Sequence, residues 1–228
     1  DGELPPFDIN EEGFLGSGRF NSVFWLDFEG ATVSANDSFI VKKAELNQVV
    51  IPPFAPSDIN SNENAEALKL AIVQDLVTFF PDVDVKFTTT KPLSAVFSRV
   101  HIGGNNFTKG ANVLGISPLD LGNRLGNDIL FVFPQVLSNV SDTRKARVEW
   151  THAIAHEIAH ALGAQHIDNQ DALMKTSVSS NADSFNLSGP VVGKPSDTEN
   201  SLQILLQSAG SRSAAFSEQT LPNIVDLD

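Results

Sequence analysis

The segment HEIAHALGAQH, residues 156–166, carries three histidines, a glutamate and a glycine at a spacing that predicts a metal site on a helix. On an α-helix, residues four apart lie on one face, so His156 and His160 can direct two imidazole nitrogens at one ion. Gly163 permits a backbone turn that most residues resist, which ends the helix and returns His166 as a third ligand. Three protein nitrogens leave a fourth position open, which is typical of a catalytic zinc and not of a structural one.

The glutamate of this segment predicts catalysis. Glu157 follows the first histidine directly, so its side chain points about 100° around the helix and lies beside the metal, where a carboxylate can hold and deprotonate a water molecule. Two histidines on one helix face, taken alone, are more often solvated or partly buried side chains than ligands. The glutamate, the glycine and the third histidine at fixed spacing make a chance pattern the weaker interpretation. We therefore predict that the segment binds a catalytic zinc ion.

The composition is that of a globular chain without cysteine. Of the 228 residues, 41% are hydrophobic and 19% are charged, so the chain can bury a core, and we expect one domain over residues 1–228. The formal net charge of −13 argues against nucleic acid as a partner, because phosphates demand clustered Lys and Arg. Without cysteine, any metal must be held by nitrogen and oxygen. No apolar run approaches about twenty residues, so no membrane span is expected.

Hydrophobic periodicity predicts a strand, a helix and four further strands before the motif. Residues 24–30 alternate as a strand with one buried face, and Asp27 and Glu29 are expected on its solvated face, with cation binding as the alternative. Apolar residues at helical spacing predict a helix that follows an N-cap at Ser61 and stops at Pro81. The four strands are expected over residues 83–90, 96–102, 113–118 and 129–133.

Oxygen-bearing side chains gather in the loop before the last of these strands. Such ligands suit calcium, so the loop could bind Ca²⁺, although turn chemistry explains the same residue types. The residues are Asp120, Asn123, Asn127 and Asp128.

The motif helix is expected to begin at Asp142 or Thr143 and to bury an apolar stripe against the core. The stripe consists of Ile154, Ile158 and Leu162. His152 lies one turn before the motif and is interpreted as a neighbour, because the set of three ligands is already complete. His101 stands alone on an expected strand and is interpreted as structural.

After the motif, Met174 is the only methionine of the chain. A lone methionine is usually core filler, but this one lies where the chain must turn back beneath a metal site. Residues 175–195 are rich in Ser, Asn, Gly and Pro and are predicted to form a long loop. A last helix is expected after a capping box at residues 196–199, with Gly210 as its stop.

The histidine segment with Met174 downstream resembles the signature of the metzincin zinc endopeptidases, and the short step from His166 to Met174 is most similar to that of the matrixins. The resemblance implies an α+β fold, in which a metzincin-like catalytic domain has a mixed, twisted sheet, a sheet-packing helix, a zinc-binding active-site helix and a C-terminal helix. It also implies an upper sub-domain over about 21–163 and a lower one over about 164–228. Residues 1–20 are rich in Pro, Gly and acidic residues and are predicted to form an exposed lead-in.

The resemblance further assigns roles to residues of this chain. His156, His160 and His166 would hold one catalytic Zn²⁺, Glu157 would be the general base and later the proton donor, and Met174 would form the floor beneath the metal. An edge strand would pair with an extended peptide or protein substrate. Its residues are Val113, Leu114, Gly115, Ile116 and Ser117.

The chain is similar to bacterial secreted metzincin-like proteins, and this resemblance implies a secreted, monomeric protein. The chain opens at Asp1 without a basic start or an apolar segment, which suits a mature form after removal of a signal peptide and of any pro-segment.

The chain also departs from parts of this family. It has no tyrosine, which excludes the extra tyrosine ligand of astacins and serralysins, and no cysteine, which excludes a cysteine switch within the chain. His101 alone cannot build the structural zinc site of animal matrixins. Lys175 and Thr176 stand where matrixins usually have Tyr-Pro, so the outline of the primed-side specificity pocket is left open.

Two other functions remain open at this stage. One is a catalytically idle, zinc-stabilised binding or adhesion module derived from a protease, which the presence of Glu157 disfavours because ligation alone does not require a glutamate there. The other is an aminopeptidase or another zinc hydrolase, for which no group that captures a substrate terminus is evident.

Overall fold

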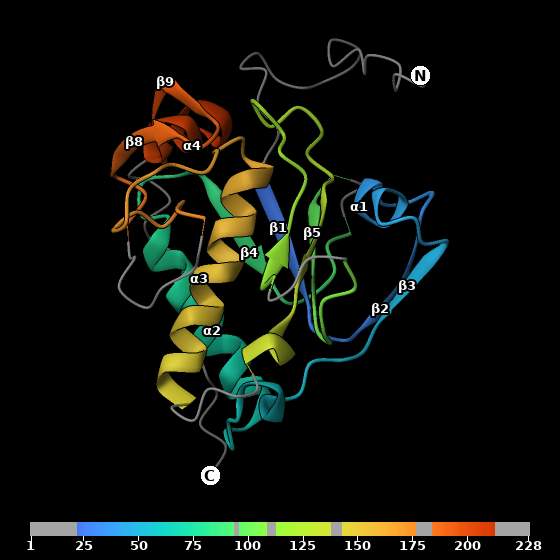
Figure 1. Ribbon diagram of the computed structural model, residues 1–228. Helices are drawn as coiled ribbons and strands as arrows, with labels where there is room; N and C mark the ends of the chain where they lie inside the picture. Colours follow the sequence, from blue (N-terminus) through green and yellow to red (C-terminus); the bar gives the residue numbers. More distant parts are fainter. Residues whose placement is uncertain (1–21, 94–95, 109–112, 138–142, 177–183, 213–228) are drawn as a thin grey trace.

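A computed structural model describes five stretches of the chain (Figure 1). They are residues 22–93, 96–108, 113–137, 143–176 and 184–212. The expected lead-in over residues 1–20 lies outside them. None of the helices in these stretches is both long and apolar enough to cross a membrane.

A five-stranded sheet in the order β4-β1-β5-β7-β6 forms the centre of the fold (Figure 1). Neighbouring strands run parallel except for β6, which closes one edge and pairs antiparallel with β7. The strands are β1 (Ser22–Asp27), β4 (Val85–Thr88), β5 (Ser98–Ile102), β6 (Gly115–Ile116) and β7 (Ile129–Val132). The four later strands lie within the predicted ranges, and the mixed sheet with helices packed on it confirms the α+β class.

β1 is buried along one face, and at its C-terminal end the other face is buried as well. Phe24 and Leu26 are buried as their alternation predicts. The prediction that Asp27 lies in solvent is wrong, because this side chain is only 4% exposed and its Oδ2 lies 3.0 Å from Nδ1 of His101 on β5. A parallel strand in the middle of a sheet has other elements packed on both faces, so the polar side of its alternation does not reach water. Glu29, beyond the strand, is exposed and pairs with Lys69 at 2.8 Å.

Two long helices, α2 (Ala65–Phe79) and α3 (Thr143–Ala161), cover one face of the sheet, on the left in Figure 1. Trp150 of α3 is fully buried and stacks on Phe54, with ring centroids 4.6 Å apart. The buried stripes have the predicted helical spacing and consist of Leu68, Ile72 and Leu76 in α2 and of Ile154 and Ile158 in α3, with Leu162 just beyond it. These apolar faces anchor α3, and with it the histidine motif, on the sheet.

The start of α2 differs from the prediction. Asn64, and not Ser61, is the N-cap, because its Oδ1 accepts hydrogen bonds from the backbone N–H groups of Glu66 and Ala67 at 2.9 and 3.3 Å. Ser61 is buried in the preceding turn. Both residue types cap helices well, so the path of the chain decides between them. For α3, the proposed N-cap at Asp142 lies outside the described residues.

The opposite face of the sheet is covered by elements that were not predicted, on the right in Figure 1. They are the hairpin of β2 (Ala31–Ser34) and β3 (Gln48–Ile51) and the short helix α1 (Phe39–Lys43). A second apolar cluster joins them to the sheet through Phe131 and Phe133. Two 3-10 turns, η1 (Pro56–Ile59) and η2 (Pro134–Leu137), contact each other and α3.

The chain after α3 forms an antiparallel hairpin and a last helix, which lie together beyond the C-terminal end of α3 (Figure 1). The hairpin consists of β8 (Ser188–Val191) and β9 (Lys194–Asn200), and α4 (Ser201–Ala209) follows. The predicted long loop over residues 175–195 is therefore wrong at its C-terminal end, where β8 and the start of β9 lie.

The predicted capping box at residues 196–199 is also wrong. These residues belong to β9, and α4 begins after Asn200, whose Oδ1 accepts a hydrogen bond from Gln203 N at 3.0 Å. Pairing with β8 occupies the backbone groups that a helix start would need. Gly210 ends the helix as predicted, with φ of 93°.

Candidate active site

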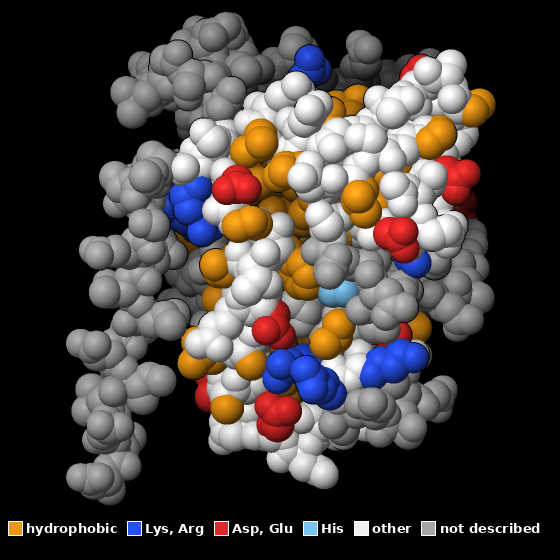
Figure 2. Space-filling view, turned by 90° about the vertical axis from the view of Figure 1, so that its left-hand side faces the viewer, with side chains coloured by type: hydrophobic (Ala, Val, Ile, Leu, Met, Phe, Trp, Pro, Cys, Tyr) orange, Lys and Arg blue, Asp and Glu red, His pale blue; other side chains and the backbone are white. Residues whose placement is uncertain are grey.

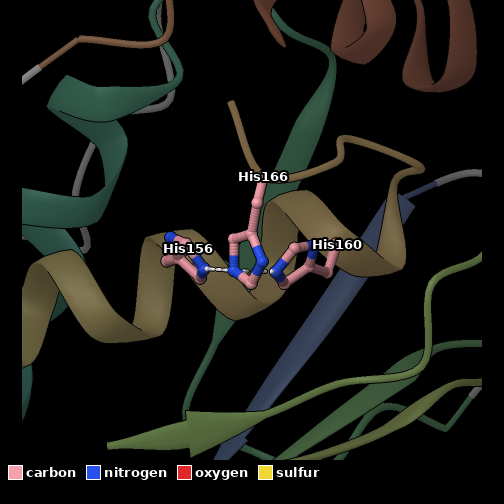
Figure 3. Close-up of side chains that lie close together, drawn as sticks. All are labelled: His156, His160 and His166. Carbon is pink, nitrogen blue, oxygen red and sulfur yellow. Dashed lines mark hydrogen bonds between the residues drawn. The ribbon is translucent and has the colours of Figure 1, made fainter. Parts of the chain in front are cut away.

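Three histidines converge at the C-terminal end of α3 (Figure 3). His156 and His160 project from the helix, and His166 comes from the segment that follows it and points between them. The Nε2 atom of His166 lies 3.0 Å from Nε2 of His156 and 3.2 Å from Nε2 of His160. Within the stretches that the structure describes, this is the one group of three or more His, Cys, Asp or Glu residues arranged to hold a metal ion.

The spacing and the tautomers of these rings fit zinc. Nitrogens that each lie about 2.0–2.1 Å from one tetrahedral zinc are about 3.3 Å apart, close to the observed separations. His156 Nδ1 lies 2.9 Å from the carbonyl oxygen of Leu173, and His160 Nδ1 lies 2.7 Å from that of Ala164. A carbonyl oxygen only accepts, so each Nδ1–H donates and each Nε2 presents a lone pair to the common centre.

Burial keeps the imidazoles in the neutral form that ligates metals. Desolvation lowers the pKa of His156 to about 4 and, with the nearby charges of His156 and His166, that of His160 to about 3. Desolvation also lowers the pKa of His166, which is half-buried. At neutral pH no proton has to be displaced before these rings can bind a cation.

Gly163 turns the chain at the end of α3, as its place in the motif predicts. Its φ of 95° lies in a region that favours glycine, and its N–H donates to the carbonyl oxygen of His160 at 2.9 Å. The loop after β6 packs against this turn, since a Cβ at Gly163 would lie 3.0 Å from the carbonyl oxygen of Asp120 and from the amide nitrogen of Gly122. Glycine therefore serves both the turn and the close packing of the loop.

Glu157 lies between the histidine helix and the edge strand β6. Its side chain is 7% exposed, and desolvation raises its pKa to about 8. A Cβ added to Gly115 of β6 would lie 2.5 Å from Cγ and 2.8 Å from Oε1 of Glu157. The absence of a side chain at Gly115 thus makes room for the carboxylate, a role that the sequence pattern does not reveal.

The hairpin β8–β9 holds the segment that carries His166. Val192 N donates to the carbonyl oxygen of His166 at 2.9 Å. Glu199 of β9, 6% exposed, accepts hydrogen bonds from N and Nε2 of Gln165 at 2.8 and 3.1 Å. Glu199 was missed as a site residue because its contribution depends on a strand where a capping box was predicted.

Met174 is fully buried behind this segment. Its carbonyl oxygen accepts a hydrogen bond from Ile167 N at 2.9 Å, next to the bond that Leu173 receives from His156. The backbone of Leu173 and Met174 is thus attached both to the His156 ring and to Ile167, which follows His166. Its place as the floor beneath a metal stays a prediction.

The predicted substrate strand is short. Only Gly115 and Ile116 belong to β6, while the carbonyl oxygen of Leu114 still accepts a hydrogen bond from Phe133 N at 2.7 Å and so extends the pairing with the neighbouring chain segment. Val113 and Ser117 flank the strand. The expected location at the sheet edge beside the motif helix agrees with this arrangement.

Asp120 and Asp128, the two carboxylates considered for calcium, belong to no group of three or more His, Cys, Asp or Glu side chains that could hold a metal ion in the described stretches. Asp120, Asn123 and Asp128 are buried, whereas Asn127 is exposed. Asp120 Oδ2 accepts a hydrogen bond from Leu125 N at 2.8 Å. Burial and the neighbouring charge of Asp120 raise the pKa of Asp128 to about 7. Calcium at this loop therefore stays a prediction.

The two other histidines lie outside the group of three. The ring of His152 packs edge-on against Phe79 of α2, with centroids 4.8 Å apart. His101 is buried beside Asp27 and stacks on Phe131. Both positions agree with the interpretation of His152 as a neighbour that is not a ligand and of His101 as structural.

The sequence comparisons identify the class of protein. The family model described as Matrixin matches residues 61–190, which are 130 of the 228 residues. The chain belongs to the matrixin family of metzincins, whose members are zinc metalloendopeptidases. The comparison with curated proteins yields no match.

Among solved structures, metalloproteinase-II from Bacteroides fragilis is similar to this chain, with a TM-score of 0.38 and 15% sequence identity. The match covers 72% of this chain and 49% of the other, so the chain spans about half the length of that relative. A likeness at this level adds nothing to the assignment of a function.

Proposed function

We propose that this protein is a zinc-dependent endopeptidase that hydrolyses peptide bonds within extended segments of proteins. The observation that carries the proposal is the convergence of three neutral imidazoles, with Nε2 separations of 3.0 and 3.2 Å, next to a buried glutamate. Membership of the matrixin family supports it. His156, His160 and His166 are the proposed ligands of the ion.

A zinc ion held by His156, His160 and His166 would supply Lewis-acid chemistry, which polarises a carbonyl and brings the pKa of water close to neutral. Glu157 accepts the proton of the attacking water and then donates it to the leaving amine. Burial raises the pKa of its carboxyl to about 8 in the metal-free chain, and a cation held by the three histidines beside it would favour the ionised form that accepts a proton. Leu173 and Ala164 orient the rings of His156 and His160 through their carbonyl oxygens.

The substrate is proposed to bind as an additional strand on β6. This strand lies at the edge of the sheet, and Gly115 on it packs against Glu157, so a peptide paired with β6 would pass the carboxylate. We further propose that the chain acts outside the cell as a monomer, with Met174 supporting the site from behind.

Replacement of the glutamate tests the catalytic role. Glu157→Gln keeps the shape of the side chain but removes its ability to take a proton, so cleavage of a denatured protein should fall by about 10²- to 10⁴-fold while the zinc content stays at one ion per chain. Glu63→Gln is the matched control, because Glu63 is an exposed glutamate outside the site. Zinc content is measured by metal analysis, and cleavage is followed with and without a chelator.

Ordinary activity of Glu157→Gln would contradict the role of the glutamate. A wild-type protein that binds zinc but leaves every protein and peptide substrate intact would instead favour the idle binding module. Cleavage confined to chain ends would favour an aminopeptidase.

A further inference from the structure

Two cations and two aromatic rings meet on the central sheet. Trp25 lies on β1, Arg99 lies beside it on β5, and Lys91 follows β4 on the other side of β1. The guanidinium carbon of Arg99 lies 5.7 Å from the centre of the Trp25 ring and 5.6 Å from that of the Phe97 ring. Nζ of Lys91 also lies 5.7 Å from the centre of the Trp25 ring. We call these four residues the cation–aromatic cluster.

The cluster lies away from the proposed active site. β1 and β4 stand at the opposite end of the strand order from β6, the strand that packs against Glu157 (Figure 1). Phe24 and Leu26 of β1 point into the core beneath α2 and α3. Trp25 lies between them in the strand, so its side chain points to the other face of the sheet. The cluster is therefore no part of the region where a peptide would meet the three histidines.

The cations of the cluster differ from others in the structure because they have no acidic partner. Neither Lys91 nor Arg99 forms an ion pair within the described stretches, and Nε of Arg99 is buried there without a hydrogen-bond partner. On the face that α2 and α3 cover, several Lys and Arg side chains lie directly beside Asp or Glu side chains (Figure 2). The paired cations include Lys69, Lys145 and Arg147. Since the chain has 28 acidic and 15 basic residues, two neighbouring cations without an acid stand out as a place for an anion.

The aromatic rings hold these cations in position. Trp25 Nε1 donates a hydrogen bond to the carbonyl oxygen of Thr89 at 3.3 Å, which fixes the orientation of the indole. Phe97 packs edge-on against Trp25, with ring centroids 5.9 Å apart. The face of an aromatic ring attracts a cation, so the two rings position the guanidinium of Arg99 before any ligand arrives. Such preorganisation lowers the entropic cost of binding.

We propose that the cation–aromatic cluster is a docking site for an acidic peptide segment, whose carboxylates bind to Lys91 and Arg99. A guanidinium can bind a carboxylate through two parallel hydrogen bonds, and an ammonium adds a compact charge. The Trp25 ring already has two cations over it, which disfavours stacking of a nucleobase or a sugar. The net charge of −13 repels a long polyanion such as nucleic acid, whereas two cations match two neighbouring carboxylates.

Tryptophan fluorescence tests the docking site. Trp25 is partly exposed and Trp150, the other tryptophan, is fully buried, so a ligand at the cluster changes the emission of Trp25. The protein is titrated with a hexaglutamate peptide and, for comparison, with hexaglutamine. We expect a saturable change with hexaglutamate alone, and a Kd that rises by about tenfold in Lys91→Gln and in Arg99→Gln. Lys42→Gln is the matched control, because Lys42 is an exposed lysine on α1, and its Kd should equal that of the wild type.

The same titrations contain the results that would overturn the docking site. These are the absence of a saturable change in the wild type, an equal Kd in the wild type and both cluster variants, and tighter binding of hexathymidylate or of a heparin hexasaccharide than of hexaglutamate. The melting temperature establishes that each variant folds, and Lys91→Gln, at an exposed position, suffices if Arg99→Gln does not fold. Repeating the titrations in the Glu157→Gln protein keeps the peptides intact. The readout is binding, so the result does not depend on the proposed endopeptidase function.

Discussion

Asp128 is a carboxyl that weakens the fold at neutral pH, and Asp128→Asn should therefore stabilise the protein. The side chain is 5% exposed in the loop before β7, and its Oδ2 has no hydrogen-bond partner within the described residues. Burial and the charge of Asp120 raise its pKa from an ordinary value near 3.8 to about 7. The folded state thus binds this proton more tightly than the unfolded chain does. The contribution of Asp128 to the free energy of unfolding is therefore fully present below about pH 3.8 and is lost as the pH rises to about 7.

The size of the effect follows from the same shift. Each tenfold difference in proton affinity is worth about 1.4 kcal/mol, so the ionised Asp128 costs about 4 kcal/mol at a pH above 7. An asparagine avoids the charge but still buries a polar amide, which costs about 1–3 kcal/mol when it lacks a partner. We expect Asp128→Asn to gain about 2 kcal/mol over the wild type at pH 8 and to show no gain at pH 4.

Urea unfolding of metal-free protein between pH 4 and 8 measures this difference as a free energy of unfolding. Asp82→Asn is the control, because Asp82 is exposed and its loss of charge should leave the curve nearly unchanged. A wild type that is as stable as Asp128→Asn at pH 8 would refute the reasoning, since Asp128 would then ionise without cost. A rise in the melting temperature on adding calcium, present in the wild type and absent in Asp128→Asn, would place a calcium ion at this loop.

Three further outcomes are expected. Gly115→Ala should push the Glu157 carboxylate aside and lower kcat/KM by about 10- to 100-fold at unchanged zinc content, because a displacement of about 1 Å suffices for such a loss. Unchanged kinetics would contradict the contact between Gly115 and Glu157. Glu199→Gln should weaken zinc binding by about tenfold in a chelator competition, since it loosens the segment of His166; equal affinity would show that the hairpin does not support the site. Metal-free protein should lose about 3 kcal/mol of unfolding free energy through His156 as the pH falls from 6.5 towards 4, because the pKa of this residue is lower in the folded state than in the unfolded chain. An unfolding free energy that stays constant over this pH range would contradict the prediction.

The histidine motif could be understood from sequence because its geometry is local. Helical spacing places His156 and His160 on one face, and Gly163 returns the chain within a few residues, so the group of three depends on little beyond one helix and one turn. The apolar stripe of α3 is predictable for the same reason. The stop of α2 before Pro81 also follows from the backbone chemistry of that residue.

Other predictions failed where two distant segments decide the outcome. Residues 196–199 fit a capping box, but β8 pairs with them as a strand and Glu199 turns to Gln165 instead. Asp27 alternates like a solvated residue, but its strand lies in the middle of a parallel sheet with elements on both faces. In both cases the local pattern is compatible with two structures, and packing against distant elements decides which of them forms.

The sequence by itself determined the family, the three histidines and the neighbouring glutamate, because these features lie within eleven consecutive residues whose relative geometry an α-helix sets. Tertiary structure alone decided what surrounds them. Gly115 of β6 makes room for Glu157, and Glu199 of β9 holds the residue before His166. Such contacts join segments that are far apart in the chain, so no local period or spacing encodes them.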